Sequence, residues 1–372
     1  MEIENLLKMM VEKKGTDLHL KAGLPPMVRI NGEIDPLIDT EKLSSENIKQ
    51  LLSKYIGFGE DKKLHDNKEF DFACELPGIA RFRGALFFQK GNYGAVFRTI
   101  PAKIPTIDEL NLPQVLKEII SSEMGLVLVT GPTGSGKSTT MAAMINHLNE
   151  SFKENIITIE DPIEFVHADK KSIVNQREIG MDTNTFATAL KSALRQDPDV
   201  ILVGEMRDSE TISTALTAAE TGHLVISTLH TNDTKQTIDR IIDTFTPEQQ
   251  LQIRFQLSLF LKAVIAQRLV KRKDGKGMVA AIEIMVNTPF IKALIAESKT
   301  GQISKAIEDS SSFYKTQSFN QSLLTLYKNG TISIDDALAT SNNPSDLKIQ
   351  IQSLDFAKKQ EGQNEPKTNR NF

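Results

Sequence analysis

The spacing of hydrophobic residues changes about one hundred residues into the chain. Before that point, short apolar runs are separated by turn residues: Asn31-Gly32 lies between two of them, and a longer pair turns near Gly91. Asn-Gly is typical of tight β-hairpins. The first fifteen residues, "MEIENLLKMMVEKKG", have the spacing of an amphipathic helix. Residues 1–100 are therefore predicted to form a small α+β domain.

After these hundred residues, strand-like runs and an amphipathic helix alternate. Met141, Met144, Ile145 and Leu148 follow the i, i+3, i+4, i+7 spacing of a helix. This helix stands between the runs "GLVLVT" and "IITIE", and the runs "VILVG" and "LVIST" follow. Such alternation predicts a largely parallel sheet with helices on its faces, an α/β core that we place at residues 114–286.

Three further segments complete the predicted organisation. Residues 101–113 contain three prolines and are expected to be an interdomain linker. Residues 287–356 have a helical pattern. Residues 357–372 have almost no apolar side chain to bury, so we expect a disordered tail.

Composition narrows the class of protein. The chain has 372 residues, a formal net charge of −4 and 40% hydrophobic residues, an ordinary balance for a globular protein. Its apolar runs are shorter than the ~18 residues that span a bilayer, and its N-terminus lacks the pattern of a signal peptide. We therefore expect a cytoplasmic protein. The overall acidity argues against a dedicated nucleic-acid binder.

A phosphate-binding loop is the strongest motif in the sequence. "GPTGSGKS" matches G-x-x-x-x-G-K-[ST] at every position, follows a predicted strand and precedes the amphipathic helix. In such loops, backbone N–H groups surround phosphate oxygens. Lys137 is expected to reach the β- and γ-phosphates of ATP, and Ser138 to hold Mg²⁺. The predicted nucleotide-binding residues are Gly131, Pro132, Thr133, Gly134, Ser135, Gly136, Lys137, Ser138 and Thr139.

Acidic residues follow two of the predicted strands. "IITIEDPIEF" ends in Glu160, Asp161 and Glu164, and "VILVGE" ends in Glu205. Nucleotide hydrolysis needs a carboxylate to activate water and others to hold Mg²⁺, although a solvated acidic loop would look the same. Glu164 is our candidate for the general base, with Glu160 and Asp161 in supporting roles. Glu205 stands in the Walker B position, but it follows a glycine, so we expect it to act through metal-bound water.

Two histidines flank the strand-like run in "TGHLVISTLHT". At ~3.3 Å per residue, His223 and His230 would lie about 20 Å apart, at opposite ends of a strand, so one metal ion cannot bridge them. Cys74 is the sole cysteine, so the composition argues against a zinc site. His230 is predicted at a strand exit, where ligands bind in open α/β sheets. For His223, a structural and a functional role remain equally open.

Arginines in the N-terminal domain form a second cluster. Arg81 and Arg83 share one face of a strand, and a turn at Lys90-Gly91 would place Arg83 opposite Arg98. Like charges across a ladder are destabilising, so we expect an anion between them. Surface charges without a ligand are the alternative. The sharper interpretation is an arginine finger that a neighbouring subunit supplies to ATP.

Ordered blocks of residues over about 1–355 resemble the bacterial secretion and pilus ATPases, and among them the type IV pilus retraction ATPases (PilT family). The blocks are "GTDLHLKAGLPPMVRINGEI", "GPTGSGKST", "IITIEDPIEFVH", "VNQREIG", "ALRQDPDVILVGEMRDSETISTALTAAETGHLVISTLHT" and "AQRLV". The resemblance implies a PAS-like N-terminal domain, a RecA-like P-loop ATPase core and a homohexamer. It also implies ATP-driven pilus disassembly beside an inner-membrane platform protein, with only peripheral membrane association.

The resemblance also assigns roles by motif. It implies that Glu164 is the catalytic glutamate, Glu205 the atypical Walker B acid, and His223 and His230 the histidine box, with His230 sensing the γ-phosphate. "PFIKALIAESKTGQI" resembles the retraction-specific segment, which usually begins Ala-Ile-Arg-Asn-Leu-Ile; Phe290 and Lys292 depart from it. "KAVIAQRLVKRKDGK" is also similar to the PilU-like accessory paralogues.

Three other functions are consistent with parts of the sequence. A pilus assembly or type II secretion ATPase would share the core, but one cysteine cannot form its usual tetracysteine zinc module. A RecA-like nucleic-acid motor would need stacking aromatics, and this chain has no Trp and four Tyr. A nucleotide-gated binding module with low turnover would differ from a motor in its release of phosphate.

Overall fold

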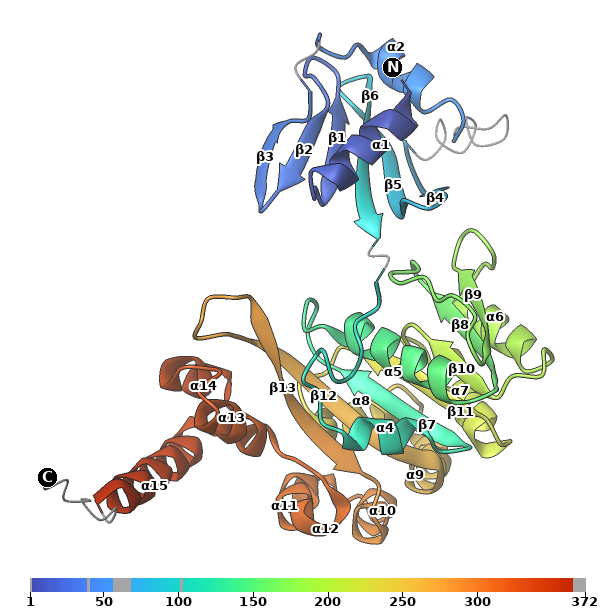
Figure 1. Cartoon of the computed structure of the whole chain (residues 1–372). Helices are drawn as coiled ribbons and strands as arrows, with labels where there is room; N and C mark the ends of the chain where they lie inside the picture. Colours follow the sequence, from blue (N-terminus) through green and yellow to red (C-terminus); the bar gives the residue numbers. More distant parts are fainter. Residues whose placement is uncertain (1, 39–40, 56–67, 101–102, 364–372) are drawn as a thin grey trace, which may run out of the picture. The chain divides into compact units, whose positions relative to one another are not determined.

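The computed structural model describes residues 2–38, 41–55, 68–100 and 103–363, with no side chains described beyond Phe356. By their contacts, the described residues divide into two compact units (Figure 1). The first contains the residues up to Lys103 together with Glu164–Val166, and the second contains Ile104–Ile163 and the residues from His167 onward. None of the described helices is long and apolar enough to cross a membrane.

The described residues of the N-terminal unit form a six-stranded antiparallel sheet and two helices. The strand order is β3-β2-β1-β6-β5-β4. The strands are β1 Asp17–Lys21, β2 Met27–Ile30, β3 Glu33–Pro36, β4 Glu69–Leu76, β5 Ala80–Gln89 and β6 Asn92–Ile100. The helices are α1 Ile3–Glu12 and α2 Ser45–Leu51. Both predicted hairpins are present, because Asn31-Gly32 joins β2 to β3 and Lys90-Gly91 joins β5 to β6.

One face of this sheet is apolar and the other is charged. Leu7 of α1 and Ile48 of α2 pack in one core with Phe82 of β5 and Phe97 of β6, all fully buried. Since neighbouring residues of a strand point to opposite faces, Arg83 and Arg98 lie on the face that carries no helix of this core. The alternation along β5 and β6 thus separates a packed face from a face with exposed arginines.

The second unit contains a seven-stranded sheet in the order β13-β12-β7-β11-β10-β8-β9. All neighbouring strands are parallel except β12 and β13, which form an antiparallel pair at one edge. The strands are β7 Gly125–Thr130, β8 Asn155–Glu160, β9 Ile173–Glu178, β10 Val200–Val203, β11 Leu224–Leu229, β12 Leu261–Lys271 and β13 Met278–Val286. The predicted α/β class is confirmed.

Helices cover both faces of this sheet (Figure 1). In the central strand β7, Leu126 and Leu128 pack with one group of helices, whereas Val127 and Val129 pack with the other. The first group is α6 Phe186–Ala193, α7 Ser209–Glu220, α8 Thr234–Asp243, α9 Pro247–Phe260, α10 Pro289–Ala296 and α11 Ile303–Asp309. The second group is α4 Val115–Ile120 and α5 Lys137–Ser151. A strand buried on both faces explains why β7 reads as an uninterrupted apolar run.

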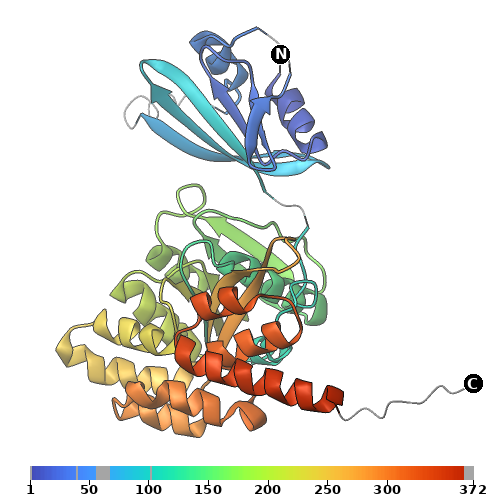
Figure 2. The same ribbon diagram turned by 90° about the vertical axis from the view of Figure 1, so that its left-hand side faces the viewer.

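The C-terminal region is helical, as predicted. The helices α13 Phe319–Lys328 and α14 Ile334–Thr340 pack on β13 and β12, and α15 Pro344–Gln363 packs on both helices (Figure 2). Two shorter elements, η1 Thr300–Gln302 and α12 Ser311–Tyr314, flank α11. Apolar residues of α13 to α15 form a separate core with Ala266 and Val270 of β12.

Two predicted boundaries differ from the structure. Ile107 and Leu112, placed in the linker 101–113, are buried in the core that α4 and α5 share with the sheet. Because these side chains are buried there, the second half of the segment belongs to the second unit, whereas residues 101–102 lie outside the described residues. The tail expected to be disordered from 357 continues α15 to Gln363, because it begins with strong helix formers. Residues 364–372 lie outside the description.

Candidate active site

The sheet brings the predicted chemistry to the carboxyl ends of its parallel strands. Thr130 at the end of β7 pairs with Leu229 at the end of β11, and Val203 of β10 pairs with Ile159 of β8. The phosphate-binding loop follows β7, Glu205 follows β10 and His230 follows β11. Ligands bind at this edge in open α/β sheets.

The phosphate-binding loop joins β7 to α5, as the sequence predicts. Gly136 has φ 88° and precedes α5, which starts at Lys137. The Nζ atom of Lys137 donates to the carbonyl oxygens of Gly131 at 2.9 Å and Pro132 at 3.2 Å. The ammonium group therefore lies over the loop and close to the N-terminus of α5, where backbone N–H groups and the helix dipole favour an anion.

Two glycines of the loop are required both by their backbone conformation and by close neighbours. Gly131 has φ 147° and Gly136 has φ 88°, and both lie in the region that L side chains rarely adopt. A Cβ atom on Gly131 would collide with the carbonyl oxygen of Gln267, and one on Gly136 would lie 2.8 Å from the Nε2 atom of Gln267. The loop is thus packed closely against β12.

Glu205 and His230 meet at the ends of β10 and β11. The Oε2 atom of Glu205 lies 3.5 Å from Nε2 of His230, and its Oε1 atom lies 2.6 Å from Nη2 of Arg207. The Glu205 side chain is 13% exposed, whereas the His230 side chain is 50% exposed. The carboxylate is therefore held between a cation and an imidazole. No role for Arg207 was predicted from the sequence, although this basic residue stands two positions after Glu205.

Hydrogen bonds between strands fix the position of this carboxylate. The Thr228 hydroxyl donates to the carbonyl oxygen of Gly204 at 2.6 Å, and the N–H of Met206 donates to Thr228 at 3.2 Å. The N–H of Gly204 donates to Ile159 of β8 at 2.8 Å. Gly204, which departs from the usual Walker B sequence, thus bonds both neighbouring strands, β8 and β11. Glu205 is the next residue in the chain.

The acids after β8 occupy different surroundings. Glu160 accepts hydrogen bonds from Thr158 at 2.6 Å and Gln176 at 3.1 Å, so its carboxylate braces the sheet. Asp161 and Glu164 are exposed on the loop that follows. An exposed carboxylate can reach water, as a general base must, and the role of Glu164 as the base stays a prediction.

His223 lies at the opposite end of β11 from His230. Its Nδ1 atom is 3.0 Å from the carbonyl oxygen of Ala218 and 3.3 Å from the Thr221 hydroxyl, at the C-terminus of α7. Its backbone N–H also bonds Ala218. The structure does not bring His223 to the phosphate-binding loop, because the six residues of β11 separate the two histidines. Of the two roles left open for His223, the contacts support the structural one.

The arginines of the N-terminal unit have carboxylate partners in their own chain. Arg83 lies opposite Arg98 in the β5–β6 ladder, as predicted. However, Arg98 also pairs with Asp17 of β1, whose Oδ1 accepts from Nε at 2.7 Å. Arg83 lies 3.4 Å from Asp71. Asp17 and Asp71 supply negative charge beside the two arginines, so the ladder does not by itself require a bound anion. Arg81 shares the face of Arg83 and is half-buried.

The donor set fits nucleotide-bound Mg²⁺ better than a metal held by protein alone. Within the described residues, no group of three His, Cys, Asp or Glu side chains could hold a metal ion. Mg²⁺ in ATPases keeps several waters and binds phosphate oxygens with one or two protein ligands. The Ser138 hydroxyl and the Glu205 carboxylate at the phosphate edge match that requirement.

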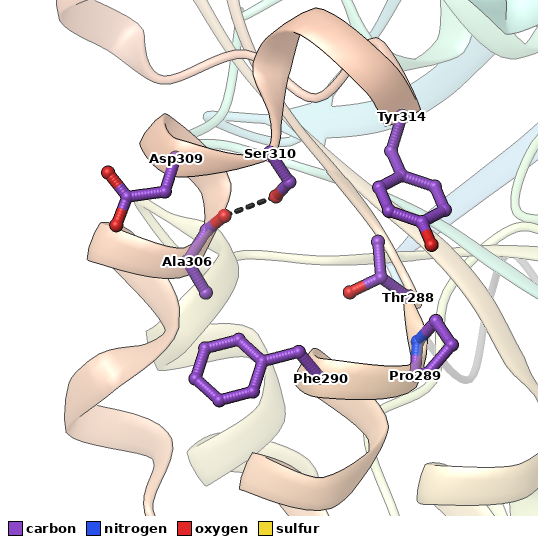
Figure 3. Close-up of a pocket in the computed structure, with 7 residues that line it drawn as sticks. All are labelled: Thr288, Pro289, Phe290, Ala306, Asp309, Ser310 and Tyr314. Atoms are coloured by element: carbon purple, nitrogen blue, oxygen red, sulfur yellow. Dashed lines mark hydrogen bonds between the residues drawn. The ribbon is translucent and has the colours of Figure 1, made fainter.

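A hollow lies among the C-terminal helices, at the start of the segment that resembles the retraction-specific one. It measures about 300 Å³ and is lined by Thr288, Pro289, Phe290, Ala306, Asp309, Ser310 and Tyr314 (Figure 3). Phe290, which departs from the family pattern, is 59% exposed, and Tyr314 faces the same space. Phe290 thus forms part of the wall of a surface pocket at a position that departs from the family pattern.

Comparisons with known proteins show the family of the chain. Residues 106–361 match the family model "Type II/IV secretion system protein". The chain is 48% identical over 347 residues to the type IV pilus retraction ATPase PilT of Pseudomonas aeruginosa, covering 93% of this chain and 100% of that protein. It is 43% identical to the type IV pilus ATPase PilU of the same organism, covering 94% of this chain and 91% of that protein.

Solved structures give the same result. The crystal structure of the pilus retraction motor PilT with bound ADP superposes with a TM-score of 0.88 at 46% identity, covering 94% of this chain and 99% of that one. The comparison confirms the predicted fold class: an N-terminal α+β domain, a RecA-like P-loop ATPase core and a helical C-terminal region. The chain is an ATP hydrolase that belongs to the type II/IV secretion system proteins and, within them, to the PilT family of type IV pilus retraction ATPases.

Proposed function

We propose that this chain forms a homohexameric motor that couples ATP hydrolysis to retraction of a type IV pilus, and so to twitching motility. The observation that carries the proposal is the similarity to a pilus retraction motor over 94% of the chain, which includes the helical C-terminal region as well as the ATPase core. A nucleic-acid motor or a binding module of low turnover would need to share only the core.

In this proposal, residues that follow different strands carry out different steps of ATP hydrolysis. The loop N–H groups and Lys137 bind the phosphates, and Ser138 and Glu205 are the residues that would hold Mg²⁺. When bound, Mg²⁺ neutralises phosphate charge. Glu164 accepts a proton from the attacking water. His230 contacts Glu205, so it is placed to respond to the γ-phosphate through a neighbouring carboxylate.

Arginines of a neighbouring subunit complete the site in our proposal. Although Nε of Arg98 donates to Asp17, the Arg98 side chain is 72% exposed, and that of Arg83 is 46% exposed. Asp17 therefore orients Arg98 while leaving most of its side chain accessible. In a ring, such an exposed guanidinium can stabilise the phosphate charge of the next subunit.

A mixing experiment tests the shared site. Lys137→Ala and Arg98→Ala chains, each inactive alone, should recover part of the ATPase activity when combined, because a mixed ring contains interfaces with an intact loop and an intact arginine. Mixed hexamers must be verified by mass, with Lys273→Ala as a control for surface charge. Verified mixed rings that release no phosphate would refute the shared site.

The location and partners follow from the same function. A pilus motor acts from the cytoplasm, so we propose that the ring binds an inner-membrane pilus platform protein and associates with the membrane only peripherally. We further propose that the chain is the main retraction motor, since the identity to PilT, 48%, exceeds that to PilU, 43%. Co-purification of the platform protein with the full chain tests this partner.

A further inference from the structure

One buried polar side chain contacts the phosphate-binding loop from another part of the chain. Gln267 lies in β12 and is 2% exposed. Its Nε2 atom donates to the carbonyl oxygen of Ser135 at 2.7 Å, and its Oε1 atom accepts from the Thr140 hydroxyl at 2.8 Å. A buried amide without partners would be costly, so these two bonds fix the side chain in one orientation.

The direction of each hydrogen bond determines which end of the Gln267 amide faces which partner. A backbone carbonyl can only accept, so the group that faces Ser135 must be the NH₂ end of the amide. The Oε1 end then faces Thr140, on the first turn of α5. Gln267 thus joins the loop to the helix that follows it, and its own backbone carbonyl lies against Gly131 at the start of the loop.

Peptide geometry connects this contact to phosphate binding. In a trans peptide, the carbonyl of one residue and the N–H of the next point in opposite directions. The bond from Gln267 draws the Ser135 carbonyl toward β12, so the N–H of Gly136 is turned away from β12. N–H groups at the end of such a loop are those that bind phosphate oxygens.

We propose that Gln267 is a positioning residue for the ATPase reaction, which holds the Ser135–Gly136 peptide with its N–H directed toward the nucleotide phosphates. The proposal rests on the assignment of residues 131–138 as the nucleotide site. Gln267 touches no reacting atom; it acts through the loop. It therefore affects nucleotide affinity before it affects the chemical step.

Gln267→Glu is the sharpest test, because the carboxylate keeps an acceptor for Thr140 but cannot donate to Ser135. Thr140→Val removes only the second bond. The matched control is Asn287→Asp: the Asn287 amide also donates to backbone carbonyls, those of Ser258 and Leu261, but Leu261 lies at the start of β12, away from the loop.

The full chain should be assayed for MgADP binding by calorimetry, for steady-state hydrolysis of ATP, and for melting temperature without nucleotide. We expect Gln267→Glu to raise the Kd for MgADP and the KM for ATP about tenfold or more, the size of one strong hydrogen bond, with a smaller fall in kcat. Thr140→Val should raise both constants about threefold. Asn287→Asp should lower the melting temperature and leave both constants unchanged.

The opposite pattern would overturn the proposal. If Gln267→Glu lowers the melting temperature but leaves Kd and KM at the wild-type values, Gln267 only supports the core. If Gln267→Glu does not fold, Thr140→Val decides: unchanged constants in that variant refute the positioning role. Wild-type protein that neither binds MgADP nor hydrolyses ATP would instead refute the nucleotide site itself, so the two failures are distinguishable.

Discussion

Packing of the last helix into the C-terminal core gives a prediction with a matched control on the same helix. Ile351 of α15 is fully buried in a core that also contains Ala266 and Val270 of β12. These two residues stand before and after Gln267 in that strand. Ile349, two residues earlier on the same helix, is 63% exposed. Replacing each with alanine removes the same atoms from the same helix, so the two variants differ only in burial.

The expected magnitudes follow from that difference. Truncation of a fully buried Ile to Ala costs ~2–5 kcal/mol, because it removes apolar contacts and leaves a cavity. For a unit of this size, each kcal/mol lowers the melting temperature by roughly 2–4 °C. A loss of about 3 kcal/mol in Ile351→Ala would therefore lower the melting temperature by roughly 6–12 °C. Ile349→Ala should change stability by less than about 0.5 kcal/mol.

Thermal unfolding of the full chain, followed by circular dichroism, measures both changes. The ATPase rate at 25 °C reports whether the remaining folded protein keeps an intact site. Equal melting temperatures for the two variants would show that α15 is not docked on the C-terminal core in solution, and would refute the packing of Ile351 in that core.

Three further predictions concern the site and its surroundings. Lys137→Ala should abolish ATP turnover because the charge on the β- and γ-phosphates is lost, and unchanged phosphate release would contradict the loop assignment. Glu164→Gln should keep nucleotide binding while lowering hydrolysis by ~10²-fold or more; lost binding would instead give Glu164 a structural role. Burial raises the pKa of Glu283, although hydrogen bonds from Thr234 act in the opposite direction. Folded protein then binds more protons than unfolded protein above pH 4.5, so wild-type stability should fall relative to Glu283→Gln as pH rises from 4.5 to 8. A difference in melting temperature that does not change with pH would refute this.

The features predicted correctly from the sequence depend on local patterns. The strand, glycine loop and helix around Lys137 lie within one continuous segment, and each part has its own signature. The same is true of the hairpin that turns at Lys90-Gly91. Alternation of strands and helices was enough to place Glu205 and His230 at one edge of a parallel sheet, where the structure shows them in contact.

The features that were missed depend on contacts between distant residues. Asp17 partners Arg98 across 81 positions, and Gln267 contacts Ser135 across 132 positions. No spacing rule reveals such pairs, since they depend on which strands become neighbours. The expectation of an anion between Arg83 and Arg98 rested on the β5–β6 ladder alone, and the pairing of β1 with β6, which brings Asp17 beside Arg98, could not be read from the sequence.

Pilus number in a strain that lacks this gene tests the central claim most directly. A retraction motor removes pili, so deletion should increase the number of surface pili and abolish twitching. Complementation with the wild-type gene should restore both, and complementation with Lys137→Ala should restore neither. A deletion strain without surface pili would contradict retraction and identify an assembly ATPase.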